Sequence, residues 1–223
     1  MQSKKWIQGI YWLVTLMTVC GLLISLVLQA NAMSAASIEE KRVAITFDDG
    51  PDPDYTAELL EGLKERGVLA TFFLLGTQIE KYPELVIRMY QDGHLIGNHS
   101  YQHVNLCNLT DEKAIEQVVK TNILIEELTG ERPLFIRPPF GCFKTDLDYE
   151  TTMIEVLWDV DPLDWNTSNT GVVVRRVLTC VEDGDIILLH DASQSSVDAA
   201  LQIIDELQKD GYSFVTIDEL ILN

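Results

Sequence analysis

Five short segments of the sequence hold ionisable side chains in patterns that suit hydrolytic chemistry. The first is the acidic pair Asp48 and Asp49, which follows an apolar run and precedes a Gly-Pro turn. The second holds two histidines at positions i and i+4, His99 and His103. On a helical turn, imidazoles with this spacing lie roughly 5–6 Å apart and can both reach one metal ion. With one carboxylate they would form a site with open positions, which is what a catalytic metal needs.

The other three segments combine charged residues with loop formers. Arg137 begins Arg-Pro-Pro-Phe-Gly, where the prolines and the glycine predict a stiff loop with an accessible backbone N–H. Asp164 precedes Trp165 in a second acidic cluster, and His190 directly follows a buried apolar run. A histidine in such a place suits a general acid, especially where a carboxylate orients it. Each segment alone is equally compatible with a turn or with loop packing, so only the combination indicates catalysis.

Strands and helices alternate along the part of the chain that carries these segments. Continuous apolar runs predict buried strands at 42–47, 70–75, 94–97, 135–136, 154–157, 186–189 and 214–216. Helical spacing predicts helices at 54–66, 83–91, 111–129 and 197–209. This alternation is typical of an α/β fold with a parallel sheet covered by helices, either open or closed into a barrel. The charged segments follow strands, where such folds form their sites. His94 instead begins the predicted strand at 94–97, and we expect it to have a structural role.

The N-terminal segment is expected to carry the protein out of the cytoplasm. Residues 6–28 contain no charged side chain, and the preceding residues 1–5 contain two lysines. A spanning helix needs about 20 apolar residues, and basic residues favour the cytoplasmic side. We expect cytoplasmic residues 1–5, a transmembrane anchor at 6–28, a linker at 29–41 and a catalytic domain at 42–223 outside the cell membrane. Alternatively, the N-terminal helix is a signal peptide and the domain is secreted, since Ala-Asn-Ala at 30–32 fits a cleavage site.

Charge and cysteine content narrow the possible partners. The formal net charge is −19, so the protein would repel phosphate backbones, and we expect no nucleic acid partner. Cys20 lies in the apolar N-terminal run. Cys107, Cys142 and Cys180 allow one disulfide, whose pairing the sequence leaves open. A cysteine metal site is not expected because no Cys-x-x-Cys pair is present.

Taken together, the five segments resemble the polysaccharide deacetylases (carbohydrate esterase family 4). TFDDGP, HSxxH, RPPFG, DxxDW and LLH occur in the order typical of this family, over about residues 42–221. The resemblance implies a distorted (β/α) barrel with fewer than eight strands. One departure lies between Gly141 and Ile154, where a short acidic stretch replaces the fuller helix usual in the family.

The resemblance also implies how the metal and the base are held. It implies that Asp49, His99 and His103 bind a divalent metal. Zn²⁺ is the first expectation, with Co²⁺, Ni²⁺ and Mn²⁺ as alternatives, because two imidazoles and a carboxylate accept all four. It implies that Asp48 is the general base and that Arg137 holds it in place.

The remaining roles concern the leaving group and the acetyl group. The resemblance implies that His190 is the general acid and that Asp164 orients its ring. Phe140 matches the position whose backbone N–H faces the developing oxyanion. Trp165 and Leu188 match the walls of the pocket that receives the acetyl methyl group.

These resemblances imply a metal-dependent hydrolase that removes N-acetyl groups from an extracytoplasmic polysaccharide. An anchor that places the domain outside the membrane would bring it to the cell wall, so peptidoglycan amino sugars are the expected substrate. The alternatives are a deacetylase of chitooligosaccharide or of O-acetyl xylan, and an inactive sugar-binding homologue. Loss of a metal ligand or of Asp48 would favour the inactive homologue, and the sequence retains them all.

Overall fold

The computed structural model describes residues 17–18, 21, 24–25, 41–150 and 152–222. The chain divides into two units, Met1–Glu40 and Lys41–Asn223. Most of the expected transmembrane anchor or signal helix at 6–28, and nearly all of the linker, lies outside the described residues. Within the described residues, no helix is long and apolar enough to cross a membrane. The N-terminal helix therefore stays a prediction.

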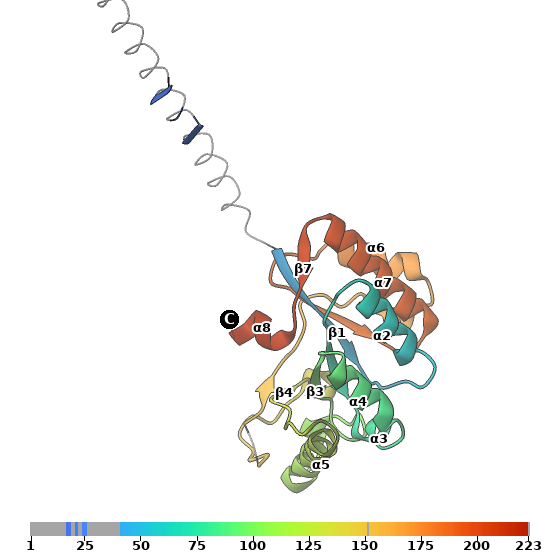
Figure 1. The fold of residues 1–223 in the computed structure, drawn as a ribbon. Coiled ribbons are helices and arrows are strands. Elements are labelled where there is room, and N and C mark those ends of the chain that lie inside the picture. The colour runs from blue at the N-terminus through green and yellow to red at the C-terminus, as the bar shows by residue number, and fades with distance from the viewer. Residues whose placement is uncertain (1–16, 19–20, 22–23, 26–40, 151, 223) are drawn as a thin grey trace, which may run out of the picture. The chain divides into compact units, whose positions relative to one another are not determined.

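A seven-stranded parallel sheet forms the centre of the Lys41–Asn223 unit (Figure 1). Its strands are β1 (Lys41–Asp48), β2 (Thr71–Leu74), β3 (Leu95–Asn98), β4 (Phe135–Ile136), β5 (Ile154–Glu155), β6 (Ile186–His190) and β7 (Tyr212–Phe214). The order is β5-β4-β3-β2-β1-β6, and β7 pairs with the start of β1. After β5, Val160 forms a single parallel bridge to Ile187 of β6, so the chain reaches the far edge of the sheet. This curled sheet agrees with the expected distorted barrel of fewer than eight strands.

Helices pack against both faces of this sheet, with α8 on the face opposite the others. They are α2 (Thr56–Glu65), α3 (Gly76–Ile79), α4 (Pro83–Gln91), α5 (Asp111–Thr129), α6 (Thr170–Leu178), α7 (Gln194–Lys209) and α8 (Ile217–Leu222). The predicted helices correspond to α2, α4, α5 and α7, whereas α3, α6 and α8 were not predicted. In α6, a run of valines suggests a strand, because β-branched side chains favour extended backbone. The helix forms because Asn169 caps its N-terminus and because Val173 and Val177 are buried where α6 packs on α7 (Figure 1).

The apolar core fills both sides of the sheet. The larger cluster lies between the sheet and the helices, with β1 residues such as Ile45 and Phe47 against Leu59 of α2 and Ile203 of α7. A smaller cluster groups Ala44, Phe73, Phe135, Val156 and Ile217, from successive strands and α8. Because alternate residues of a strand face opposite sides, the inward positions of β1 lead from Ala44 to Thr46 and then to Asp48 at the strand end.

A third small cluster packs beside β4. It contains Leu106 from the 3₁₀-helix η1 (Leu106–Asn108), Val118 of α5, Ile136 of β4 and Tyr149. Tyr149 belongs to the short acidic stretch before β5, and the described residues of this stretch form no helix. The Tyr149 ring stacks on the ring of Phe143. The disulfide left open by the sequence joins Cys107 to Cys142, and Cys180 is free and exposed.

Candidate active site

The five sequence segments meet at the carboxyl ends of the strands. Asp48 ends β1 and lies in register with His190, which ends β6. His99 and Arg137 follow β3 and β4, whose ends pair through Asn98 and Ile136. Parallel strands bring their carboxyl ends to one edge of the sheet, so side chains far apart in sequence become neighbours there.

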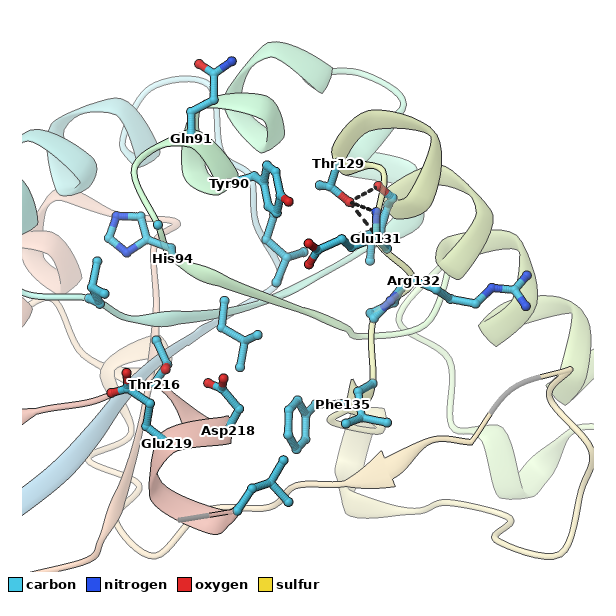
Figure 2. A pocket seen from close by; sticks show the side chains of 18 residues that line it. Tyr90, Gln91, His94, Thr129, Glu131, Arg132, Phe135, Thr216, Asp218 and Glu219 are labelled. Carbon is cyan, nitrogen blue, oxygen red and sulfur yellow. Dashed lines mark hydrogen bonds between the residues drawn. The ribbon is translucent and has the colours of Figure 1, made fainter.

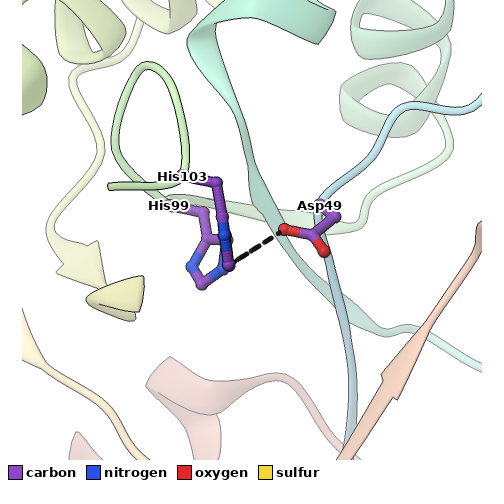
Figure 3. Close-up of side chains that lie close together, drawn as sticks. All are labelled: Asp49, His99 and His103. Atoms are coloured by element: carbon purple, nitrogen blue, oxygen red, sulfur yellow. Dashed lines mark ion pairs between the residues drawn. The ribbon is translucent and has the colours of Figure 1, made fainter. Parts of the chain in front are cut away.

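Asp49, His99 and His103 form a cluster with the separations of metal ligands (Figure 3). The Oδ1 atom of Asp49 lies 3.5 Å from the Nε2 atom of each histidine. Ligand atoms around one tetrahedral Zn²⁺, at bond lengths of about 2.0–2.2 Å, are separated by about 3.3–3.6 Å. Asp49 has a φ of 73°, a left-handed conformation that sends its carboxylate to a different side from that of Asp48.

Two features of this cluster fit a divalent metal. Asp49 Oδ1 is buried and has no hydrogen-bond partner among the described residues, which is costly unless a cation approaches it. The ring of His99 donates from Nδ1 to the carbonyl oxygen of Arg137, which leaves the Nε2 lone pair directed toward the cluster. Burial lowers the pKa of His99 against the opposing charges of Asp48 and Asp49, which favours the neutral, metal-binding form.

The two histidines do not lie on a helical turn, so that part of the sequence interpretation is wrong. The segment from His99 to His103 is a loop in which Ser100 and His103 have φ values of 67° and 55°. The Asn98 side chain accepts from the Ser100 amide, and the Ser100 hydroxyl accepts from the His103 amide. These side-chain hydrogen bonds hold the loop in place of helical backbone hydrogen bonds. The rings of His99 and His103 still lie with their centroids 5.1 Å apart.

Asp48 forms a buried ion pair with Arg137. Their Oδ1 and Nη1 atoms are 2.8 Å apart, and the two residues are 3% and 0% exposed. Arg137 also donates to the Thr46 hydroxyl and to the carbonyl oxygens of Val156 and Leu157. Burial lowers the pKa of the guanidinium and the Asp48 charge opposes this, so the carboxylate keeps its buried partner charged. One Asp48 oxygen is held in this way, and the other lies 3.8 Å from His99 Nε2.

Asp164 and His190 form a second pair beside Asp49. The Nδ1 atom of His190 lies 2.9 Å from one Asp164 oxygen, and the other oxygen accepts from the His190 amide at 2.9 Å. Burial lowers the pKa of His190, but the hydrogen bond and charge of Asp164, with the charges of Asp48 and Asp49, together raise it to about 9. Its Nε2 atom lies 4.0 Å from Asp49 Oδ2, so the ring faces the metal cluster as a proton donor.

The residues expected around the substrate have different surroundings. Phe140 is 67% exposed and has a φ of 61°, and its ring lies 5.0 Å from that of His103. Trp165 is 63% exposed and helps to line a recess of about 460 Å³ beside Asp49 and His190. Leu188 is 4% exposed one pleat below His190 and does not line this recess as the structure describes it.

Several residues near the site were missed from the sequence. The recess is also lined by hydroxyl and amide side chains from two segments, the 3₁₀-helix η3 (Asp164–Asn166) with the loop after it and the N-terminal end of α7, namely Asn166, Thr167, Ser168, Ser193, Ser195 and Ser196. Ser193, Ser195 and Ser196 lie a few residues after His190, and this closeness is the one signal in the sequence that could have indicated them. Thr46 was also missed, although it lies inside the first segment and bonds both Arg137 and the Ile187 carbonyl.

A larger recess than the one beside Asp49 lies elsewhere among the described residues. It measures about 790 Å³, and Figure 2 shows Tyr90, His94, Glu131 and Asp218 around it. None of the predicted site residues is part of its lining. His94 is buried here and accepts from the Ala70 amide at Nδ1, in agreement with a structural role. Burial lowers the pKa of His94 to about 4.

The sequence and the fold of this chain are similar to those of known proteins. The family profile described as polysaccharide deacetylase matches residues 35–156. Peptidoglycan-N-acetylmuramic acid deacetylase PdaC of Bacillus subtilis is 42% identical over 81% of this chain, but this chain spans only 39% of that protein. The solved PdaC structure has a TM-score of 0.78 to this chain and covers 82% of it, with 90% of the solved chain aligned. A peptidoglycan-N-acetylglucosamine deacetylase of Bacillus cereus is 39% identical, with 82% of this chain and 89% of that protein covered. The chain therefore belongs to the polysaccharide deacetylase family.

Proposed function

We propose that this chain is a metal-dependent hydrolase that removes N-acetyl groups from an extracytoplasmic polysaccharide, with peptidoglycan amino sugars as its substrate. The observation that carries the proposal is the placement of two ionisable pairs around one metal cluster. The free Asp48 oxygen lies 3.8 Å from His99 Nε2, and His190 Nε2 lies 4.0 Å from Asp49 Oδ2, so each pair reaches a different candidate metal ligand. A base and an acid that both face one polarised carbonyl are what amide hydrolysis requires.

Asp49, His99 and His103 would hold the divalent metal. When bound, the metal would lower the pKa of the attacking water molecule and polarise the acetamide carbonyl. The identity of the metal is open between Zn²⁺, Co²⁺, Ni²⁺ and Mn²⁺, because these ligands suit all of them.

The reaction follows from the protein groups around that centre. Asp48 accepts the proton of the attacking water through the oxygen that Arg137 leaves free. The Phe140 amide donates to the oxyanion as the carbonyl carbon becomes tetrahedral. His190 then gives its proton to the leaving nitrogen, and Asp164 stabilises the ring before that transfer. The products are acetate and a free amino sugar.

The substrate is proposed from the relatives and from the expected location. The aligned relatives carry the names of deacetylases of N-acetylmuramic acid and of N-acetylglucosamine in peptidoglycan. A disulfide within the domain supports an oxidising compartment, where such bonds persist. We propose that residues 6–28 anchor the protein in the cell membrane with the domain outside. Secretion after cleavage near residue 32 is the alternative.

Acetate release tests the activity. The full chain, loaded with Zn²⁺ or Co²⁺, should release acetate from peptidoglycan faster than from chitooligosaccharide or from acetylated xylan. Release from xylan alone would replace the substrate proposal, and binding of sugar without any release would indicate an inactive homologue. For location, the mass of the mature chain and its digestion by external protease on intact cells should show an uncleaved, outward-facing protein. A chain that begins after residue 32 and occurs in the medium would refute the anchor.

A further inference from the structure

The Cys107–Cys142 disulfide joins the two loops that carry the most exposed parts of the site. Cys107 follows the metal-binding candidate His103 by four residues, and Cys142 follows Phe140 by two. The Cα atoms of the two cysteines are 5.9 Å apart. The bond therefore connects the third ligand position directly to the loop whose amide would face the oxyanion.

The two histidines of the cluster differ in how firmly the protein holds them. The side chain of His99 is 4% exposed, and its Nδ1–H is bound to the Arg137 carbonyl. The side chain of His103 is 36% exposed, and the contacts described for its ring are to Asp49, His99 and Phe140. His103 thus depends on the position of its loop, whereas His99 is held by the end of the sheet.

The backbone of both loops also needs support. His103 and Phe140 have φ values of 55° and 61°, which are uncommon for residues with a side chain. Such conformations persist only where the surrounding structure holds them. Among the described residues, the two segments are linked at their base by the bond from His99 to the Arg137 carbonyl, and beyond the cysteines by Lys144, which bonds the Leu109 carbonyl and Asp111.

The base of these loops is held without the disulfide. Leu106, next to Cys107, is fully buried against Val118, Ile136 and Tyr149. This apolar packing anchors η1 to β4 and α5. Loss of the covalent bond should therefore leave the fold in place and change the separation of His103 from Phe140.

We propose that the Cys107–Cys142 disulfide is a positioning element of the active site, which holds His103 for the metal and the Phe140 amide for the oxyanion. Its catalytic part rests on the proposed function. Reduction by a water-soluble phosphine converts the S–S bond into two thiols, while the phosphine takes oxygen from water and becomes its oxide. The two loops then separate, and both metal binding and turnover weaken.

The test compares the full chain with a Cys107→Ala/Cys142→Ala variant, both carrying Cys20→Ser and Cys180→Ser so that no stray thiol binds metal. We expect the variant to bind Zn²⁺ roughly 10–100-fold more weakly in a chelator competition, as when a residue that supports a metal ligand is removed. We expect kcat at saturating Zn²⁺ to fall by roughly tenfold or more, with KM changed less than about twofold. Amide hydrogen exchange should quicken in 100–109 and 138–142 and stay unchanged in the strands.

Cys20→Ser/Cys180→Ser alone is the matched control, because Cys180 is exposed and both positions lie outside the two loops. It should match the wild type in metal affinity and turnover, and phosphine treatment of the wild type should reproduce the double variant reversibly. A folded double variant with unchanged metal affinity and loop exchange would overturn the proposal. A variant unfolded throughout, by circular dichroism, would also overturn it, since the bond would then support the whole fold. Failure of the oxidised wild type to release acetate would refute the proposed function and leave the metal and exchange measurements decisive.

Discussion

Replacing Asp48 by Asn separates the proposed base from the proposed metal site. The change keeps the size of the side chain and one acceptor oxygen, so Arg137 still finds an acceptor at the 2.8 Å position. It removes the negative charge and the ability to take a proton from water. Because Asp48 lies outside the cluster of Asp49, His99 and His103, the variant should still bind its metal.

The expected loss of activity follows from the role of a general base. Removal of such a group typically lowers the rate by 10²–10⁴-fold, which corresponds to roughly 2.7–5.5 kcal/mol of transition-state stabilisation. The variant should also be less stable, because Arg137 is 0% exposed and loses its counter-charge. Breaking a buried ion pair costs roughly 3–5 kcal/mol, and the retained hydrogen bond should keep the loss at or below the lower end of that range.

The assay measures three quantities on Asp48→Asn and on a matched Asp49→Asn variant. These are bound metal, acetate release at saturating metal, and the free energy of unfolding in urea. Asp48→Asn should keep its metal and lose turnover, whereas Asp49→Asn should lose metal affinity first. The reasoning is refuted if Asp48→Asn loses its metal while Asp49→Asn retains it, because the roles of the two carboxylates would then be exchanged.

Three further predictions concern the acid, the metal and the buried histidine. Asp164→Asn should lower kcat and move the alkaline limb of the pH–rate profile to lower pH, because Asp164 helps to raise the pKa of His190 to about 9; an unmoved limb would exclude His190 as the titrating acid. Removal of metal by a chelator should abolish acetate release and readdition of Zn²⁺ or Co²⁺ should restore it, and activity that survives complete metal removal would contradict the proposed mechanism. His94 has a folded-state pKa of about 4 and an ordinary value of 6.5, so the unfolded chain takes up its proton first as pH falls. The contribution of neutral His94 to the free energy of unfolding is thus complete above pH 6.5 and lost toward pH 4, by up to about 3 kcal/mol. His94→Asn should remove this pH dependence, as measured by urea unfolding at several pH values.

Much of the architecture could be predicted from the sequence because its signals are local. All seven strands and four of the helices were recognised from apolar runs and helical spacing, and α5 ends at Thr129 as predicted, with Gly130 after it in a left-handed conformation. The missed helices are short or misleading in composition. In α6, tertiary burial of Val173 and Val177 prevails over the preference of valine for strands.

The candidate site shows the same division. The residue types at strand ends indicated which side chains meet, and the structure brings Asp48, Asp49, His99, Arg137 and His190 together. The loop conformation of the two histidines was predicted wrongly, because the i and i+4 spacing does not distinguish a helical turn from a loop held by Asn98 and Ser100. The roles assigned to these residues stay predictions until the variants are measured.

The sequence by itself determined which chemical groups are present. These are two adjacent carboxylates, three histidines near strand ends and a stiff loop that begins with Arg137. Only the tertiary structure decided the distances, because Asp48 and Arg137 are 89 positions apart and meet through the register of parallel strands. It also decided which cysteines pair, since Cys107, Cys142 and Cys180 allow three alternative pairings and the structure joins Cys107 to Cys142. Residue identity sets the chemistry of which a side chain is capable, whereas strand pairing and burial set which groups lie next to it.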